Sequence, residues 1–261
     1  MVVFCACNRE GDENINNPKN YYLTPLTDFG NGSYQGIKGG LYPNGENERP
    51  KAHNEVGLAI VESMKPLDRN GNVDEINGKI VWLSIGMSNT TQETSRFLEL
   101  MKSYPDKNPM LELVDGAFGG QAINQIVKKK FPNVRIAYLS SRIYGGYAKT
   151  GLNPEPFAWY TGWANKLLIE DQINGDPRLT YKGADAKSPW LSWGPYFWAN
   201  GTTPNAQGFS WLESDMRDDD GTHPGPGARQ KVAEGLIKFF ETDETAVPWF
   251  LKKDSKIGKN K

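Results

Sequence analysis

Three residues of this sequence lie in short motifs whose residue types suit nucleophilic catalysis. Ser88 lies in IVWLSIGMSNTTQE, where an apolar run ends in Gly-Met-Ser-Asn, and Asp220 and His223 lie much later in DGTHPGPGA. A serine hydroxyl is a weak nucleophile without a base, and His223 is one of only two histidines in the chain. The Asp-x-x-His spacing lets one turn bring the carboxylate to the imidazole, where it can fix the tautomer and stabilise the imidazolium.

Each motif taken alone also fits a purely structural role. A serine beside a helix start commonly caps that helix, and Asp-x-x-His commonly caps a turn. Thr90 and Glu93 fit a capping box at the start of a helix, and His53 fits a structural position. The acidic pair Asp218 and Asp219 fits a solvated turn better than a metal site. The case for catalysis therefore depends on the elements that would bring the serine and the histidine together.

The stretch from residue 79 onward alternates short apolar runs with amphipathic ones. We predict strands in 79–85, 110–115 and 134–142, each followed by helical sequence in 90–104, 122–131 and after Pro156, and a last helix over 228–240. Strands that alternate with helices imply a parallel sheet covered on both faces. Ligands bind at the carboxyl ends of such strands, which is where Ser88 lies. Gly86 permits a tight turn there, and the next helix offers free amide N–H groups.

The residue composition and pattern of the chain change at about residue 79. Residues 1–78 are rich in Gly, Asn, Pro and Asp, which predicts an irregular N-terminal extension packed on the core, with one short helix near His53–Met64. Residues 79–261 form the predicted α/β domain, and 150–218 break its pattern as an insertion. Six of the eight tryptophans fall in that insertion. They could form a platform for stacking sugar rings, or pack the insertion against the sheet.

The order of these motifs resembles the SGNH (GDSL-like) hydrolase superfamily over about residues 79–241. The resemblance implies a three-layer α/β/α sandwich with a flavodoxin-like central parallel sheet. It also implies that Ser88 is the nucleophile, that His223 and Asp220 complete a catalytic triad, and that the amides of Ser88 and Gly119 form the oxyanion hole. Met87 stands where the family usually has aspartate, and Gly-x-Ser-Asn is similar to the carbohydrate acetylesterase branches.

The family's third block, Gly-x-Asn-Asp, supplies an oxyanion-hole asparagine and has no counterpart in this sequence. Arg142 or a neighbouring side chain of LSSRIYGGY is a candidate replacement. Asn89, Gln121, Arg142 and Trp193 are the candidate substrate-binding residues. Losing one oxyanion donor costs on the order of 10²–10³ in rate. A non-catalytic carbohydrate-binding protein on a degenerate fold therefore stays open as an alternative.

We expect a carboxylic ester hydrolase that cleaves short acyl esters, in particular acetyl esters on a carbohydrate, without a cofactor or metal. A lipase or lysophospholipase is a further alternative and would need a tunnel for an acyl chain. The net charge of −1, from 30 basic and 31 acidic residues, gives no argument for nucleic acid as a partner. No stretch approaches the roughly 20 apolar residues of a membrane-spanning helix.

The two cysteines, Cys5 and Cys7, are too close in sequence for an ordinary disulfide, so no disulfide framework is expected. The start MVVFCACN reads as the remainder of a secretion signal, with Cys7 as a candidate for lipid attachment, or as a frayed terminus. The first interpretation predicts a secreted or periplasmic protein, and the second leaves a cytoplasmic one open.

Overall fold

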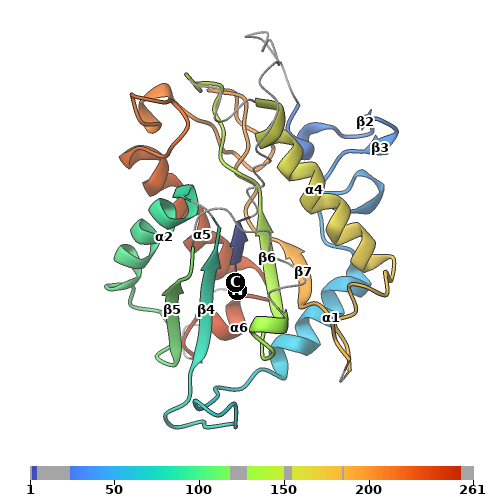
Figure 1. Ribbon diagram of the computed structural model, residues 1–261, viewed down its shortest axis with the longest axis vertical. Coiled ribbons are helices and arrows are strands. Elements are labelled where there is room, and N and C mark those ends of the chain that lie inside the picture. Colours follow the sequence, from blue (N-terminus) through green and yellow to red (C-terminus); the bar gives the residue numbers. More distant parts are fainter. Residues whose placement is uncertain are drawn as a thin grey trace.

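The computed structural model describes residues 2–4, 24–86, 88–117, 128–149, 155–183 and 185–253, with the backbone alone at 2–4 and 155–157. Over these residues the chain is a mixed α/β protein (Figure 1). The strands are β1 (Val2–Phe4), β2 (Ser33–Tyr34), β3 (Ile37–Lys38), β4 (Ile80–Ile85), β5 (Leu111–Asp115), β6 (Ile136–Ser140) and β7 (Trp190–Trp193). The α-helices are α1 (Lys51–Glu62), α2 (Ser88–Met101), α4 (Glu155–Ile173), α5 (Pro226–Thr242) and α6 (Val247–Phe250), and the 3-10 helices are η1 (Leu26–Asp28), η2 (Pro43–Gly45) and η3 (Glu213–Asp215).

Five strands form one parallel sheet in the order β5-β4-β1-β6-β7 (Figure 1). The predicted strands β4, β5 and β6 are confirmed within a residue or two at each end. The middle strand is β1, from the very start of the chain, and β2 with β3 forms a separate antiparallel hairpin. Since all five strands run in one direction, their carboxyl ends share one edge of the sheet.

Two of the predicted domain boundaries need correction. Residues 2–4, which the sequence pattern placed in an N-terminal extension, form the central strand, so the extension and the α/β domain share one sheet. The segment 150–218 is likewise not a pure insertion, because α4 and β7 follow β6 as a further helix and strand of the same fold. Strands β1 and β7 are short and neither alternates between polar and apolar residues, so the sequence pattern did not predict them. Cys5 and Cys7 lie outside the described residues.

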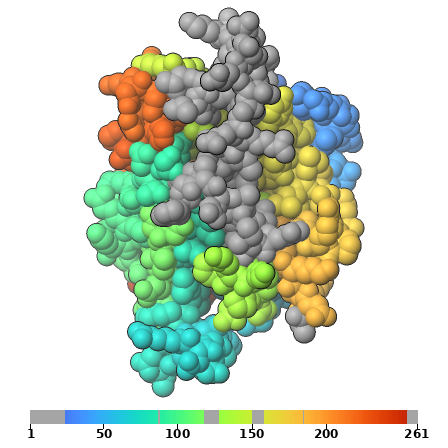
Figure 2. Space-filling view, viewed as in Figure 1, coloured from blue at the N-terminus to red at the C-terminus, as the bar shows by residue number. Residues whose placement is uncertain are grey.

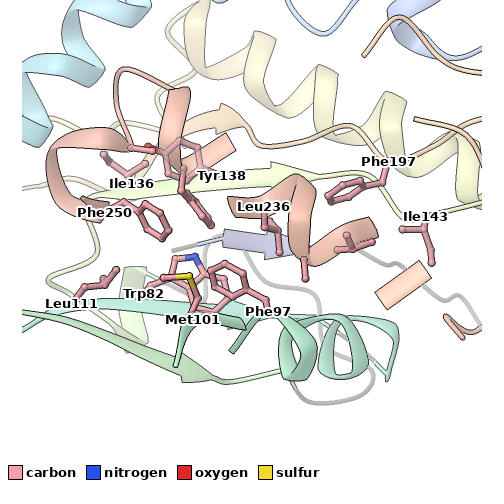
Figure 3. Packing of buried hydrophobic residues seen from close by; sticks show 14 of the residues in the cluster. Trp82, Phe97, Met101, Leu111, Ile136, Tyr138, Ile143, Phe197, Leu236 and Phe250 are labelled. Carbon is pink, nitrogen blue, oxygen red and sulfur yellow. The ribbon is translucent and has the colours of Figure 1, made fainter. Parts of the chain in front are cut away.

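The sheet carries a buried core on each face, because neighbouring residues of a strand point in opposite directions. In β6, Ile136 and Tyr138 join a core with α2, α5 and α6, whereas Ala137 and Leu139 join a second core with α4 and parts of residues 26–42. Figure 3 shows the first core, in which Trp82 of β4 lies against Phe97 and Met101 of α2. Burial of these side chains fixes α2 on the sheet and thereby fixes the residue at its start.

Helices pack near both edges of the sheet and support the segments around the carboxyl ends of the strands. Figure 1 shows α2 and α5 side by side near β5 and β4, and α4 beside β6 and β7. The predicted helices near His53–Met64, after Pro156 and over 228–240 are confirmed as α1, α4 and α5. Of the helix predicted over 122–131, residues 128–130 are helical and most of the rest lies outside the described residues. In Figure 2 the turns between α1 and β4, in cyan, form one end of the visible face, and the segment before α5, in orange, lies toward the other.

Candidate active site

Ser88 is the first residue of α2 and stands three residues after Ile85, the last residue of β4. A Cβ at Gly86 would overlap the Thr90 side chain, so this turn requires glycine to let the helix start close to the strand. The Ser88 side chain is exposed at the sheet's carboxyl edge. Its amide is one of the first four of the helix, which have no intrahelical acceptor, and lies at the positive end of the helix dipole. Negative charge that develops beside Ser88 is therefore stabilised.

The structure brings the serine and the Asp-x-x-His motif together. Ser88 Oγ lies 3.1 Å from His223 Nε2, and His223 Nδ1 lies 2.7 Å from Asp220 Oδ2. A carboxylate can only accept, so Nδ1 carries the proton of the neutral ring and Nε2 is free to accept the Ser88 hydroxyl proton. The three side chains, from two segments far apart in sequence, thus form a hydrogen-bonded chain in which the imidazole can accept the serine proton.

Asp220 is held as a carboxylate by its own turn. Partial burial works to raise its pKa, but the backbone N–H groups of His223 and Thr222, which donate to Oδ1 over 2.9 and 2.8 Å, together with the His223 ring lower the pKa to about 2. One carboxyl oxygen therefore caps the turn while the other holds the imidazole. The structural and the catalytic interpretations of Asp-x-x-His are both satisfied by one side chain.

The loop that carries His223 is tied at several points along its length. Arg217 N donates to the His223 carbonyl over 2.9 Å, and Lys149 N donates to the Asp220 carbonyl over 2.8 Å. Gly221 has a φ of +63°, and a Cβ there would overlap the Tyr147 carbonyl. Glycine is thus required directly after Asp220, since the left-handed conformation and the close approach to residue 147 both exclude a side chain.

Asn89 is oriented toward this loop. Its side chain is 8% exposed, and Nδ2 points at the Thr222 carbonyl over a long 3.4 Å contact. The residue after Ser88 thus faces inward on α2, and a role for Asn89 in substrate binding stays a prediction. Asn89 joins the first turn of α2 to the residue before His223.

The turn after β5 lies next to the nucleophile turn. Ser84 Oγ of β4 donates to Asp115 Oδ1 over 2.8 Å, and Ala117 N donates to the same oxygen over 3.0 Å. These bonds fasten the start of the glycine turn to the strand that leads to Ser88. Gly119 and Gln121, predicted as an oxyanion donor and a substrate-binding residue, lie outside the described residues.

Arg142 follows the end of β6 at the same edge of the sheet. It lies close enough to Glu93 of α2 for its positive charge to act on the Glu93 carboxyl. Glu93 is 2% exposed, and burial raises its pKa to about 7 while Arg142 works to lower it. The predicted capping box is wrong, because α2 begins at Ser88 and places Glu93 inside the protein. A role for Arg142 in substrate binding stays a prediction.

The tryptophans pack the protein interior. Trp193 is 2% exposed, and its indole N–H donates to the Leu41 carbonyl over 2.5 Å, so the prediction that it binds substrate is wrong. The same holds for a sugar-stacking platform, because each of the six tryptophans between residues 159 and 211 is at least 95% buried: Trp159, Trp163, Trp190, Trp193, Trp198 and Trp211. Their number reflects two aromatic cores.

The second histidine has the structural role that the sequence suggested. His53 of α1 stacks on Trp190, and its Nε2 donates to the Leu191 carbonyl over 2.8 Å. Burial lowers its pKa, which keeps the ring neutral. It belongs to the packing of α1 and takes no part in the triad.

Two cavities are lined by residues of the described chain, and neither is lined by a triad residue. The larger, about 1190 Å³, lies between α1, the start of β4 and residues 128–136, and the smaller, about 460 Å³, lies around Arg49, Trp193 and Asp243. The lipase alternative stays a prediction.

Sequence reasoning missed the residues that hold the His223 loop in place. Arg229 donates from Nε to the Pro224 carbonyl over 2.9 Å and from its terminal nitrogen to Gln92 of α2 over 2.6 Å. A signal was present, because an arginine in the first turns of a helix opposes the helix dipole and needs a specific partner there. The backbone contacts from residues 147–149 carry no such signal in the sequence.

Comparison with known proteins gives no independent assignment, since no family model, no curated protein and no solved structure matches this chain. Within the described ranges, no helix has the length and apolar character needed to cross a bilayer. In the same part of the chain, no three His, Cys, Asp or Glu side chains gather as metal ligands would. The case for a function therefore depends on the geometry around Ser88.

Proposed function

We propose that this protein is a serine hydrolase that cleaves short acyl esters. The observation that carries the proposal is the chain Asp220 Oδ2–His223 Nδ1 at 2.7 Å and His223 Nε2–Ser88 Oγ at 3.1 Å. Ser88 Oγ attacks the ester carbonyl as His223 Nε2 takes its proton, and Asp220 stabilises the imidazolium. His223 then returns the proton to the leaving alcohol. A water molecule, deprotonated by His223, releases the acyl group as a carboxylic acid.

The proposal extends to the fold and to the substrate class. A parallel sheet with a core on each face, a nucleophile turn after a central strand and a histidine just before the last long helix support an SGNH-like three-layer sandwich. The acetyl and carbohydrate specificity rests on the Gly-x-Ser-Asn motif alone, since the tryptophans are buried. For the oxyanion, the Ser88 amide at the start of α2 is one donor, and Gly119 is proposed as the other.

Substitution of the nucleophile tests the proposal directly. We expect Ser88→Ala to lower turnover of p-nitrophenyl acetate by at least about 10³-fold, because the hydroxyl forms the acyl-enzyme bond. Ser95→Ala is the matched control, since Ser95 is an exposed serine of the same helix. A serine-directed phosphonate should label Ser88 in the wild type and not in Ser88→Ala. Full activity of Ser88→Ala would overturn the mechanism.

The finer parts of the proposal have their own measurements. A series of p-nitrophenyl esters from acetyl to octanoyl should show the highest kcat/KM at acetyl, and a preference for octanoyl would refute the acetylesterase assignment. Release of acetate from an acetylated polysaccharide tests whether the substrate ester is carried by a carbohydrate. Glycan binding without turnover or labelling would favour the non-catalytic alternative, which the absent third block first suggested.

A further inference from the structure

Arg229 links the loop of the general base to the helix of the nucleophile. Its Nε donates to the carbonyl of Pro224, the residue after His223, over 2.9 Å. A terminal nitrogen of the same guanidinium donates to Gln92 Oε1 of α2 over 2.6 Å. One planar group thus spans the His223 loop and the second turn of α2, whose first residue is Ser88.

The position of Arg229 near the start of α5 is electrostatically unfavourable for a cation. It is the fourth residue of α5, close to the positive end of the helix dipole, where a carboxylate would be the stabilising choice. No acidic residue lies in the first turn of α5. An arginine here therefore carries a free-energy cost through the helix dipole. The Pro224 carbonyl and the Gln92 amide oxygen offset that cost.

The carbonyl of Pro224 is an effective point at which to hold the loop. Proline has no N–H, so this residue can be fixed by backbone hydrogen bonds only through its carbonyl. Arg217 N donates to the carbonyl of His223 itself. The backbone that carries the imidazole is therefore held at two consecutive carbonyl oxygens, and the Arg229 guanidinium holds the second of them.

A second arginine on the same helix interface provides an internal comparison. Arg96 of α2 donates from Nε to Gln230 Oε1 of α5 over 2.7 Å, so it also bridges the two helices. Arg96 also forms an ion pair with Glu99 of its own helix. Arg96 and Arg229 therefore share the interface, and they differ in that Arg229 also holds the His223 loop.

We propose that Arg229 is a positioning residue for His223, acting through the Pro224 carbonyl to keep the imidazole in line with Ser88 Oγ. The inference rests on the proposed function for its catalytic consequence. The positioning itself is a property of the fold and can be measured without turnover.

The test uses the full chain with its histidines labelled with ¹³C and ¹⁵N, because the two rings give one signal set each for His223 and His53. We expect Arg229→Gln to shift or broaden the His223 ring signals and to leave those of His53, which packs in α1, unchanged. Arg229→Lys can donate to only one of the two acceptors at good geometry and should give an intermediate shift. Arg96→Gln should leave both histidines at their wild-type positions.

The kinetic experiment uses the same variants and measures two quantities: the rate of labelling by a serine-directed phosphonate and the turnover of p-nitrophenyl acetate. We expect Arg229→Gln to lower kcat and the labelling rate about 10- to 100-fold with KM within about twofold, since a misplaced base slows proton transfer without removing substrate contacts. Thermal unfolding should change similarly in Arg229→Gln and Arg96→Gln. That result separates a positioning effect from a loss of helix packing.

Two results would overturn the proposal: His223 signals at wild-type positions in Arg229→Gln, or equal displacement of those signals in Arg96→Gln. Failure of the proposed function has a different signature. In that case the wild type is neither labelled nor active, whereas the histidine signals still report whether Arg229 positions the ring.

Discussion

Glu93 is a carboxyl group buried on α2, five residues after the nucleophile. Burial raises its pKa from an ordinary value of 4.5 to about 7, so the folded protein keeps a proton that the unfolded chain releases above pH 4.5. Stability contributed by this proton is complete at acidic pH and is lost as the pH rises toward 7. The difference corresponds to on the order of 3 kcal/mol across this window.

We therefore expect Glu93→Gln to flatten the pH dependence of stability. The amide has the same shape and no titrating proton, so the variant should gain stability relative to the wild type at pH 8 and lose that advantage at pH 5. Urea unfolding at pH 5, 6, 7 and 8 gives the free energy of unfolding of both proteins. Parallel curves over this range would show that Glu93 is ionised throughout, with Arg142 compensating its charge fully.

At this scale the contacts that link Ser88, His223 and Asp220 were predictable, and the surroundings of the neighbouring residues were only partly so. Asp220 and His223 are three residues apart, and the chemistry of a serine base restricts the choice to one of two histidines. Trp193 and Asn89, proposed for a substrate, are both buried. A residue type that suits a substrate also suits a core or a backbone carbonyl, and only burial distinguishes the two.

The loop that carries His223 acts as an element in its own right, and Gly221 fixes its shape. We expect Gly221→Ala to lower the phosphonate labelling rate of Ser88 about 100-fold, because a Cβ at this left-handed position would overlap the Tyr147 carbonyl and displace the neighbouring turn. Gly208→Ala is the control, since Gly208 has a φ of +82° with no atom within 4 Å of the added carbon.

This comparison separates backbone strain from displacement of the base. Both variants bear the cost of a left-handed alanine, on the order of 1 kcal/mol, which unfolding experiments would report. Only Gly221→Ala should also slow labelling. Equal labelling rates in the two variants would mean that the Asp220–His223 turn tolerates the shift.

Among the elements, those with a clear period were predictable. The strands β4, β5 and β6 show the apolar runs, and the helices α1, α2 and α5 show the apolar stripes, on which pattern reading depends. In contrast, β1 is three residues long and β7 is four. So short a stretch carries little pattern, and WLSW looked like part of an aromatic loop.

At the scale of the whole molecule, β1 joins the two halves of the sheet. It pairs on one side with Ser84 and Ile85, the last residues of β4, and on the other with residues 138–140 at the end of β6. Strand β4 leads to Ser88 and β6 leads to Arg142. The three residues of β1 thus brace the carboxyl edge at which the site is built, although they lie farthest from it in sequence.

We therefore expect a proline in β1 to weaken both the fold and the site. Val3→Pro removes an N–H from the middle strand of the sheet, which leaves a neighbouring carbonyl without its ladder bond and should cost at least about 2 kcal/mol of unfolding free energy. Lys51→Pro is the control, because Lys51 is the first residue of α1, a position that favours proline. It should change stability by less than about 1 kcal/mol.

Labelling of Ser88 extends the same experiment from stability to the active site. In Val3→Pro the end of β4 loses its support three residues before the nucleophile, so labelling should slow even in the fraction that remains folded, whereas Lys51→Pro should label at the wild-type rate. If Val3→Pro unfolds at the same urea concentration as the wild type, β1 is not the middle strand of the sheet. The presence of β4 and β6 in one sheet would then have to be explained without it.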